Sequence, residues 1–251
     1  MTTLEKNGHN KLSGLLLIVL HLGPGIIFAV FFFVLSWILI HRELTGYLAL
    51  LIAIPVCLVP IEIGVMLLWS VRFRGIRSLS EAIRYNHKGT VVDYIVLPLL
   101  LFFYWGILSI ATAPISQYLE KHLSAWFPVW VSQGALIQGL RNCPPTQRII
   151  TLVLAVLLSG FVAPIVEELY FRGFLLPRME QYGWAAPVLN SLLFAVYHFY
   201  FPGNVPGIFV VFFPIAYIVK ITKNWRIGAV VHSMINLWGV FSLFTNLSWA
   251  P

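Results

Sequence analysis

The sequence predicts an all-α membrane protein, a polytopic helical bundle that crosses the bilayer about seven times, with eight crossings as the alternative. Hydrophobic residues make up 59% of the 251 residues and charged residues only 10%, whereas soluble domains carry about 25% charged residues. The mean hydropathy is +0.87. The apolar residues also gather in runs of about 20, the length that an α-helix needs to span a bilayer.

No stretch of the chain is polar enough to form a separate soluble domain, so we expect residues 1–251 to form a single membrane-embedded domain. The net charge is +7, but the cations gather in loops, as in membrane proteins, and we expect no nucleic-acid partner. Cys57 and Cys143 lack the spacing of a disulfide framework or of a cysteine metal site.

The first part of the chain holds three predicted spans, at residues 12–40, 47–71 and 90–113. Pro24 and its flanking glycines interrupt the first run, which we expect to form one long or kinked helix because membrane helices tolerate both residue types. A basic loop follows the second span and predicts a short surface helix near Glu81. The connection 114–147 contains several tryptophans, which favours a segment lying in the membrane interface.

The second part holds four predicted spans, at residues 148–169, 184–200, 205–221 and 227–247. An N-terminus on the inside would place twelve of the sixteen lysines and arginines on the inner face. Positive charge concentrates on the cytoplasmic side of membrane proteins. We therefore expect an integral membrane protein with its N-terminus inside.

Two adjacent carboxylates and an arginine end the fourth predicted span. Glu168 and Arg172 are four residues apart and would share one helix face, with the acid before the base as preferred. Glu167 is rotated by about 100° from its neighbour and is expected to point elsewhere. Acids at membrane depth indicate a functional site by default, and the alternative is an ion pair that caps a helix at the membrane surface.

Further polar side chains interrupt later spans. Asn190, Phe194 and His198 follow one another at intervals of four and would line one helix face. His232 and Asn236 share a face in the last span in the same way. Such groups avoid lipid, so we expect them to converge with the carboxylates inside the bundle.

The converged side-chain types support two hydrolytic schemes. A glutamate and a histidine can bind a water and remove its proton, while a second histidine and an asparagine donate hydrogen bonds to an oxyanion. Alternatively, one glutamate and two histidines supply the three ligands of a catalytic zinc. The sequence has no His-Glu-x-x-His, Gly-x-Ser-Gly or Gly-x-Gly-Asp motif, which disfavours three other classes of intramembrane protease.

Three ordered motifs resemble those of a known family: Glu167-Glu168-x-x-x-Arg172, Phe194-x-x-x-His198 and His232-x-x-x-Asn236. The pattern is similar to that of the CAAX-protease and bacteriocin-processing family, the abortive-infection-type group that includes the type II CAAX prenyl endopeptidases. The resemblance covers roughly residues 148–240, which we take as the catalytic core. It implies an intramembrane endopeptidase that uses a glutamate-activated water.

The resemblance also implies residue roles. Glu167 would activate water together with His198, and His232 and Asn236 would form the oxyanion hole. Two further residues would orient the site, namely Glu168 and Arg172.

The family is often labelled as metalloproteases. If zinc is bound, its ligands here would be Glu167, His198 and His232, but the water-only scheme is equally consistent with these residues. The sequence does not decide between them.

The C-terminal part is compact, which argues against a long prenylated substrate. We expect a peptide or a membrane-protein segment as the substrate, surrounded by membrane lipid, in a bacterial plasma membrane. One alternative is a catalytically silent scaffold of the same fold that regulates another membrane protein. Another is a transporter with a glutamate–histidine proton relay, but the chain shows no inverted repeat.

Overall fold

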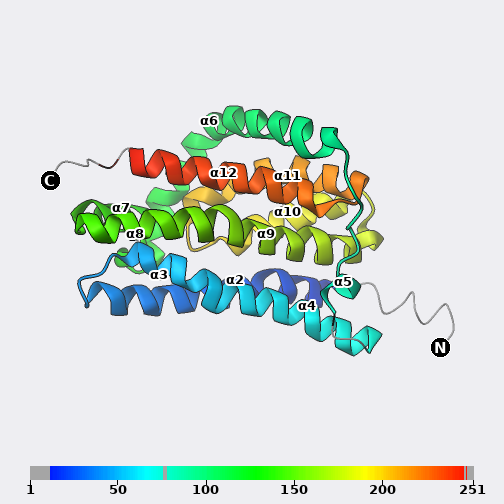
Figure 1. Cartoon of the computed structure of the whole chain (residues 1–251), viewed down its shortest axis with the longest axis horizontal. Helices are drawn as coiled ribbons and strands as arrows, with labels where there is room; N and C mark the ends of the chain where they lie inside the picture. The colour runs from blue at the N-terminus through cyan, green and yellow to red at the C-terminus, as the bar shows by residue number, and fades with distance from the viewer. Residues whose placement is uncertain (1–11, 76–77, 246, 248–251) are drawn as a thin grey trace.

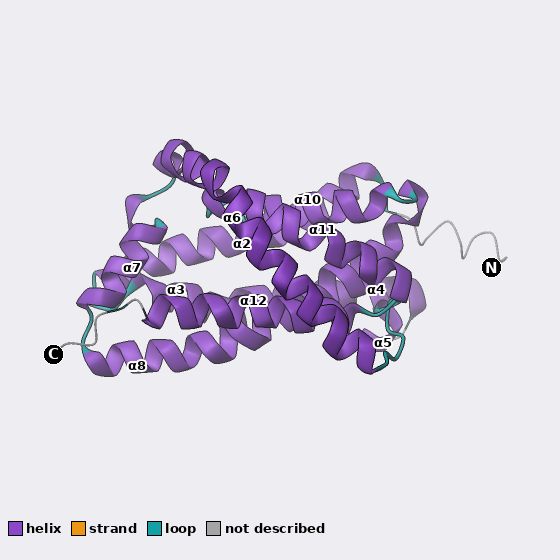
Figure 2. Cartoon of the chain, turned by 90° about the horizontal axis from the view of Figure 1, so that it is seen from above, coloured by secondary structure: helices purple, strands orange, loops and turns teal. Residues whose placement is uncertain are grey.

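The computed structural model describes residues 12–75, 78–245 and 247, and helices make up nearly all of this part (Figure 2). Its described residues form no named strand. The predicted all-α bundle is confirmed. Lys6, Lys11 and Arg77, which entered the orientation argument, lie outside the described residues.

The first part of the chain forms two long helical stretches and one short helix. Helix α2 runs without interruption through Pro24, as one helix. The bounds are α2 Gly14–Ile40, α3 Gly46–Ala53, η1 Ile54–Leu58, α4 Val59–Arg74 and α5 Leu79–Ala82. The stretch from α3 to α4 is continuous and returns along α2, because Thr45 caps the start of α3 directly after a tight turn.

The third long helix extends further than its apolar run. Its elements are η2 Val92–Val96, α6 Leu97–Leu123 and η3 Ser124–Trp126, followed by η4 Val129–Val131 and α7 Gln133–Asn142. The expectation that residues 114–147 form a connection is therefore wrong for 114–126. Pro114 lies within α6, and strong helix formers such as Gln117, Glu120 and Lys121 continue the helix beyond it.

The catalytic-core segment begins with one continuous helical stretch and continues with three shorter helices. The stretch comprises α8 Pro145–Leu154, η5 Ala155–Val162, α9 Ala163–Glu168, η6 Leu169–Leu175 and η7 Leu176–Tyr182. After it come α10 Ala185–Tyr197, η8 Pro202–Asn204, α11 Val205–Thr222 and α12 Trp225–Thr245.

Four of these elements, η1, η2, η5 and η6, are π-helical, and each ends two residues before a proline: Pro60, Pro98, Pro164 and Pro177. Proline lacks a backbone N–H, and its ring collides with the carbonyl of residue i−4. The preceding turn widens to avoid this collision, which gives a π segment. Segments η5 and η6 flank α9, so the two adjacent glutamates lie between two widened turns.

In the part of the chain that the structure describes, six helical stretches are long and apolar enough to cross a membrane: 14–40, 46–73, 92–126, 145–182, 202–222 and 225–245. The fifth predicted span, residues 184–200, does not form a helix long enough for a full crossing. Helix α10 has 13 residues, about 20 Å of helix, against a hydrocarbon core of about 30 Å. It ends at His198, ahead of the loop that contains Pro202 and Gly203.

The long helices alternate in direction along the long axis, so that α2 begins and α12 ends at opposite ends of the bundle (Figure 1). Helix α12 packs against α9, η5 and α6, and α10 packs against α2 and α11. Aromatic side chains from η6, α10 and α11 fill the core between them, among them Phe171, Phe194 and Phe212. This packing brings the three sequence motifs together.

Candidate active site

Two carboxylates occupy the last turn of α9 in the centre of the bundle. Glu167 has 4% of its surface exposed and Glu168 has none. Burying a carboxylate is costly unless it is paired or hydrogen-bonded. The surroundings of each carboxylate therefore determine what it can do.

Glu168 forms the predicted ion pair with Arg172, at 2.9 Å between Oε1 and Nη1, and both side chains are fully buried. The guanidinium lies over the ring of Phe194, 4.2 Å from its centroid, and 5.0 Å from that of Phe212. Aromatic faces attract a cation, more strongly when water is excluded. The rings and the carboxylate thus hold the arginine in one orientation.

Glycine at position 228 makes room for Glu168. A Cβ atom built on Gly228 would overlap the Glu168 carboxylate, with which α12 is in direct contact. Gly228 is one helical turn before His232, so the glycine and the histidine face α9 together.

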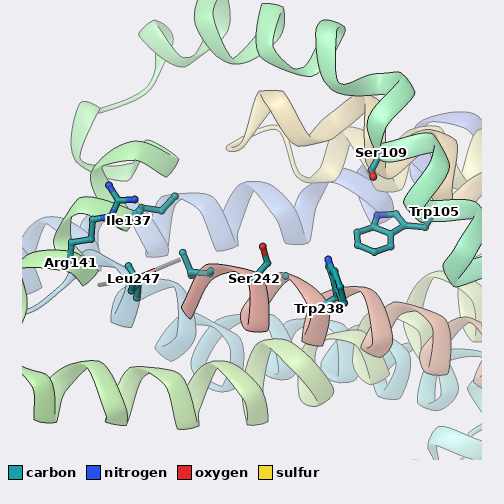
Figure 3. Close-up of a pocket in the computed structure, with 9 residues that line it drawn as sticks. Trp105, Ser109, Ile137, Arg141, Trp238, Ser242 and Leu247 are labelled. Atoms are coloured by element: carbon teal, nitrogen blue, oxygen red, sulfur yellow. The ribbon is translucent and has the colours of Figure 1, made fainter. Parts of the chain in front are cut away.

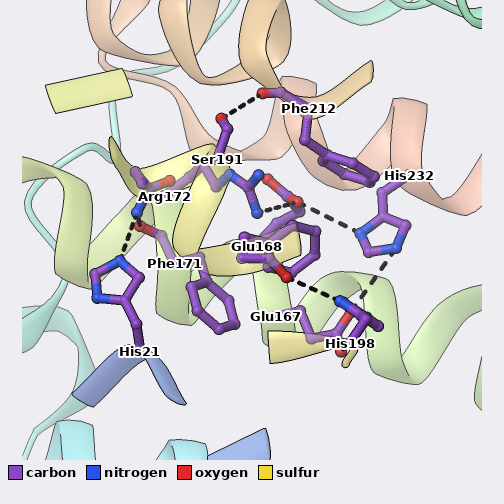
Figure 4. A network of polar contacts seen from close by, with 11 residues as sticks. His21, Glu167, Glu168, Phe171, Arg172, Ser191, His198, Phe212 and His232 are labelled. Carbon is purple, nitrogen blue, oxygen red and sulfur yellow. Dashed lines mark hydrogen bonds and ion pairs between the residues drawn. The ribbon is translucent and has the colours of Figure 1, made fainter. Parts of the chain in front are cut away.

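His232 lies between the two carboxylates (Figure 4). Its Nδ1 is 3.4 Å from Glu168 Oε1, and its Nε2 is 3.8 Å from Glu167 Oε2. Glu167 nevertheless points elsewhere than the Glu168–Arg172 ion pair, as the sequence predicts, because its other oxygen faces His198. Both carboxylates meet the same imidazole, because α12 packs across the end of α9 where the helix widens into η6.

His198 faces Glu167 from the other side, with 3.9 Å between its Nε2 and Glu167 Oε1. Its Nδ1 is 2.9 Å from the backbone oxygen of Phe194. In the neutral ring this bond places the proton on Nδ1 and leaves Nε2 as an acceptor towards Glu167.

Asn236 lies one turn after His232 on α12. Its side-chain nitrogen donates to the backbone oxygen of Ser159 at 2.8 Å. An amide nitrogen has two hydrogens, so this bond fixes the side chain and leaves a second donor. Ser159 belongs to the π segment η5, whose widened turn presents the carbonyl.

A cavity of about 760 Å³ opens onto these groups. The motif residues that line it are Glu167, Phe194, His198, His232 and Asn236. Glu168 and Arg172 do not line it and lie behind the cavity wall. The structure thus divides the six predicted site residues into four at the cavity and an ion pair that supports them.

Within the described part of the chain, no group of three or more His, Cys, Asp or Glu side chains has the arrangement needed to hold a metal ion. Glu167 is 3.9 Å from one imidazole nitrogen and 3.8 Å from the other. Ligands of one tetrahedral zinc lie about 2.0–2.1 Å from the metal, which brings them closer together than this. The zinc scheme of the sequence analysis stays a prediction.

A second polar network lies on the far side of η6. The ring of His21 is held by the Leu17 backbone oxygen at 2.8 Å from Nδ1. Asn190 then contacts His21 Nε2 at 3.1 Å and donates to the Phe171 backbone oxygen at 3.1 Å. None of these residues lines the active-site cavity.

A third carboxylate lies close to His198. Glu62 of α4 is fully buried, and its Oε1 accepts from the Tyr197 hydroxyl at 3.4 Å. The Tyr197 ring meets the His198 ring edge-on, with centroids 4.8 Å apart. Through Tyr197, the structure places Glu62 next to the site.

Residues 149–238 match the family model described as type II CAAX prenyl endopeptidase Rce1-like. Over this segment the chain is similar to the type II CAAX prenyl endopeptidases. The matched segment spans α8 to α12 and contains every cavity-lining motif residue. No curated protein and no solved structure matches the chain.

The family motifs do not reveal every residue that shapes the site. Gly228 had a signal in the sequence, a small residue one turn before a membrane-buried histidine. Phe212 had none, because one phenylalanine in an apolar span looks like any other. Its ring nevertheless packs edge-on against His232, with centroids 4.6 Å apart.

Proposed function

We propose that this membrane protein is an endopeptidase in which Glu167 and His198 activate a water that attacks a peptide carbonyl. The observation that supports this most directly is the placement of Glu167 between two imidazoles at a cavity of about 760 Å³. The family supports protease activity in general. The residue roles are our proposal.

The water would have both its hydrogens engaged. Glu167 Oε1 and His198 Nε2 are 3.9 Å apart, close enough for one water to donate to both at about 2.8 Å. Its lone pair would then face the cavity. As the oxygen attacks the carbonyl carbon, Glu167 takes one proton, and it returns this proton to the leaving amine when the C–N bond breaks.

The opposite wall would stabilise the oxyanion that forms. His232 as an imidazolium, with one proton on Nδ1 towards Glu168 and one on Nε2, would donate through Nε2 to the developing O⁻, together with the second amide hydrogen of Asn236. Donors held in place before the reaction stabilise such charge without reorganisation. The bonds of Asn236 to Ser159 and of His232 to Glu168 fix both donors.

Glu168 and Arg172 would orient the site from behind the wall. Their ion pair leaves the second contact of Glu168 for His232 Nδ1, at 3.4 Å. This contact fixes the rotation of the ring and favours a proton on Nδ1. Neither residue needs to touch the substrate.

The proposed substrate is an unprenylated peptide or a membrane-protein segment, taken up within the lipid of a bacterial plasma membrane, with the N-terminus of the enzyme inside. Apolar and aromatic side chains line much of the cavity, which suits hydrophobic peptide side chains. Because α10 to α12 pack compactly, we propose that the enzyme recognises the peptide chain itself and not an attached prenyl group.

The deciding experiment combines cleavage with metal content. Purified protein is incubated with a peptide library beside Glu167→Gln, and cleavage is mapped by mass spectrometry while zinc is measured in the same samples. We expect cleavage that disappears in Glu167→Gln. Cleavage that survives this change overturns the proposed mechanism, and stoichiometric zinc that is lost in His198→Ala assigns these residues to a metal instead.

A further inference from the structure

A second cavity adjoins the active-site cavity along α12. This second cavity has a volume of about 510 Å³. Five residues line both cavities: Trp105, Ser109, Ile137, Gly239 and Leu243. Because the two cavities share these lining residues, they adjoin each other between α6, α7 and α12, and we refer to them together as the groove.

One charged residue of each sign lines this groove. Glu167 is the only acid among the described lining residues and Arg141 the only lysine or arginine. Arg141 lies in the last turn of α7 with an exposed side chain, at the opposite end of the second cavity from Trp105 (Figure 3). None of the ion pairs found among the described residues involves Arg141.

We propose that Arg141 forms an anion subsite, which binds a substrate carboxylate about three to five residues away from the peptide bond that is cleaved. This inference rests on the proposed endopeptidase function and adds a specificity determinant to it.

The spacing follows from helix geometry. Asn236 lines the active-site cavity and Leu243 lines both cavities, seven residues further along α12, or about 10 Å at 1.5 Å per residue. Ile137 also lines both cavities, and Arg141 is one turn, about 6 Å, beyond it on α7. An extended peptide at about 3.3 Å per residue covers 10–16 Å with roughly three to five residues.

The chemistry of the second cavity suits a carboxylate. A guanidinium binds a carboxylate through two parallel N–H···O bonds. Ile137 and Leu247 form apolar walls at the Arg141 end of the cavity, and the Ser242 hydroxyl lies further along it, towards Trp105 and Trp238 (Figure 3). The carboxylate can be a chain terminus or an Asp or Glu side chain, since both present the same group.

The test measures binding in the full-length Glu167→Gln protein, which retains bound peptides uncleaved, in nanodiscs of neutral phosphatidylcholine. Apolar decapeptides of one sequence are offered as the free acid, as the C-terminal amide, and as amides with one aspartate moved along the chain. Retained peptide is quantified by mass spectrometry. Adding Arg141→Gln or Arg141→Lys tests the arginine, and Arg42→Gln serves as the matched control because Arg42 is also exposed and lines neither cavity.

We expect about tenfold tighter binding of peptides that carry a carboxylate. This preference falls to about onefold in Arg141→Gln, is partly retained in Arg141→Lys and persists in Arg42→Gln. If only the free acid binds more tightly, the subsite binds a chain terminus. If an aspartate restores tight binding to the amide, the subsite binds a side-chain carboxylate.

Equal binding of acid and amide, or a preference that survives Arg141→Gln, overturns the inference. The inference is also overturned if Arg141→Gln changes the binding of the protein to anionic vesicles but not its binding to the peptides. Cleavage assays with Glu167 intact are scored separately. Glu167-dependent cleavage without a carboxylate preference removes only the subsite, and an Arg141-dependent preference without any cleavage removes only the endopeptidase.

Discussion

Two sets of one histidine and one asparagine lie on either side of the η6 segment, one set fully buried and the other partly exposed. His21 and Asn190 bind each other and two backbone carbonyls inside the packed core. His198 and Asn236 each make one bond to a backbone carbonyl and present the rest of the side chain to a cavity. Residue types are the same in both pairs.

Access to a cavity, not residue type, separates a reactive polar group from a structural one. His21 and Asn190 form a closed pair, in which both ring nitrogens of His21 contact protein atoms. His198 and Asn236 form an open pair at the cavity, in which Nε2 of His198 is 3.9 Å from the Glu167 carboxylate, across space that a water can enter. A buried polar group with protein partners stabilises the fold, whereas one that opens onto a cavity is available to a substrate.

The largest effect is expected from variants that remove a group next to the cavity. Glu167→Gln or His198→Ala should reduce hydrolysis at least about 1000-fold, because each removes a group that activates the water, while the protein stays folded. His21→Ala should leave hydrolysis per folded molecule within about threefold and lower the free energy of unfolding by about 1–3 kcal/mol. Peptide cleavage and thermal unfolding of the three variants measure both quantities.

A reversed outcome would contradict the comparison. If His21→Ala abolished cleavage in a protein with unchanged unfolding temperature, the closed network would belong to the reaction. Size-exclusion profiles of each variant control for loss of folded protein.

The second effect concerns the ion pair behind the cavity. Arg172→Ala should lower the free energy of unfolding by about 3–5 kcal/mol, because it leaves Glu168 buried without its cation. Glu168→Gln in the same protein should restore part of the loss, since it removes the uncompensated charge. Folded yield and thermal unfolding measure this effect, and equal stability of Arg172→Ala and the double variant would show that the pair does not support the fold.

Sequence alone predicted the elements whose cause is local. Long apolar runs gave the membrane helices, and the four-residue interval gave the Glu168–Arg172 pair. The motifs also named five residues that line the cavity: Glu167, Phe194, His198, His232 and Asn236. Each of these follows from helix geometry and from the cost of polar groups in lipid.

What the sequence did not predict depends on contacts between distant segments. Asn190 and His198 share a helix face in the pattern, yet the first binds His21 and only the second reaches the cavity. The sequence also did not predict that both glutamates contact His232, because the widened turns and the packing of α12 decide this contact. The short α10 was missed because the apolar run continues through Tyr200 although the helix ends at Tyr197.

The third effect compares the two asparagines directly. Asn236→Ala should lower kcat by about 10²–10³-fold, the usual cost of losing one oxyanion donor. Asn190→Ala should instead lower the free energy of unfolding by about 1–3 kcal/mol, because His21 Nε2 and the Phe171 carbonyl lose their buried donor. Steady-state kinetics and thermal unfolding are run on both. An Asn236 variant with unchanged kcat would remove this residue from the proposed oxyanion hole.

The smallest expected effect tests whether Glu62 and Tyr197 belong to the closed network around His21 or to the open network at the cavity. The Tyr197 hydroxyl binds Glu62 at 3.4 Å, whereas its ring, not its hydroxyl, packs against His198. Tyr197→Phe keeps the ring and should lower the free energy of unfolding by about 0.5–1.5 kcal/mol, with kcat/KM within about threefold of the parent protein. Tyr170→Phe is the matched control, since this buried hydroxyl donates to the Leu20 carbonyl at 2.7 Å and does not line the cavity.

Equal stability losses with near-parental kinetics in both tyrosine variants would place Glu62 with the closed network, as a buried acid that anchors α4 to α10. A fall in kcat/KM of more than tenfold in Tyr197→Phe alone would contradict this assignment. Glu62 would then act on His198 through the tyrosine hydroxyl, and the open network would extend from three elements, α9, α10 and α12, to include α4.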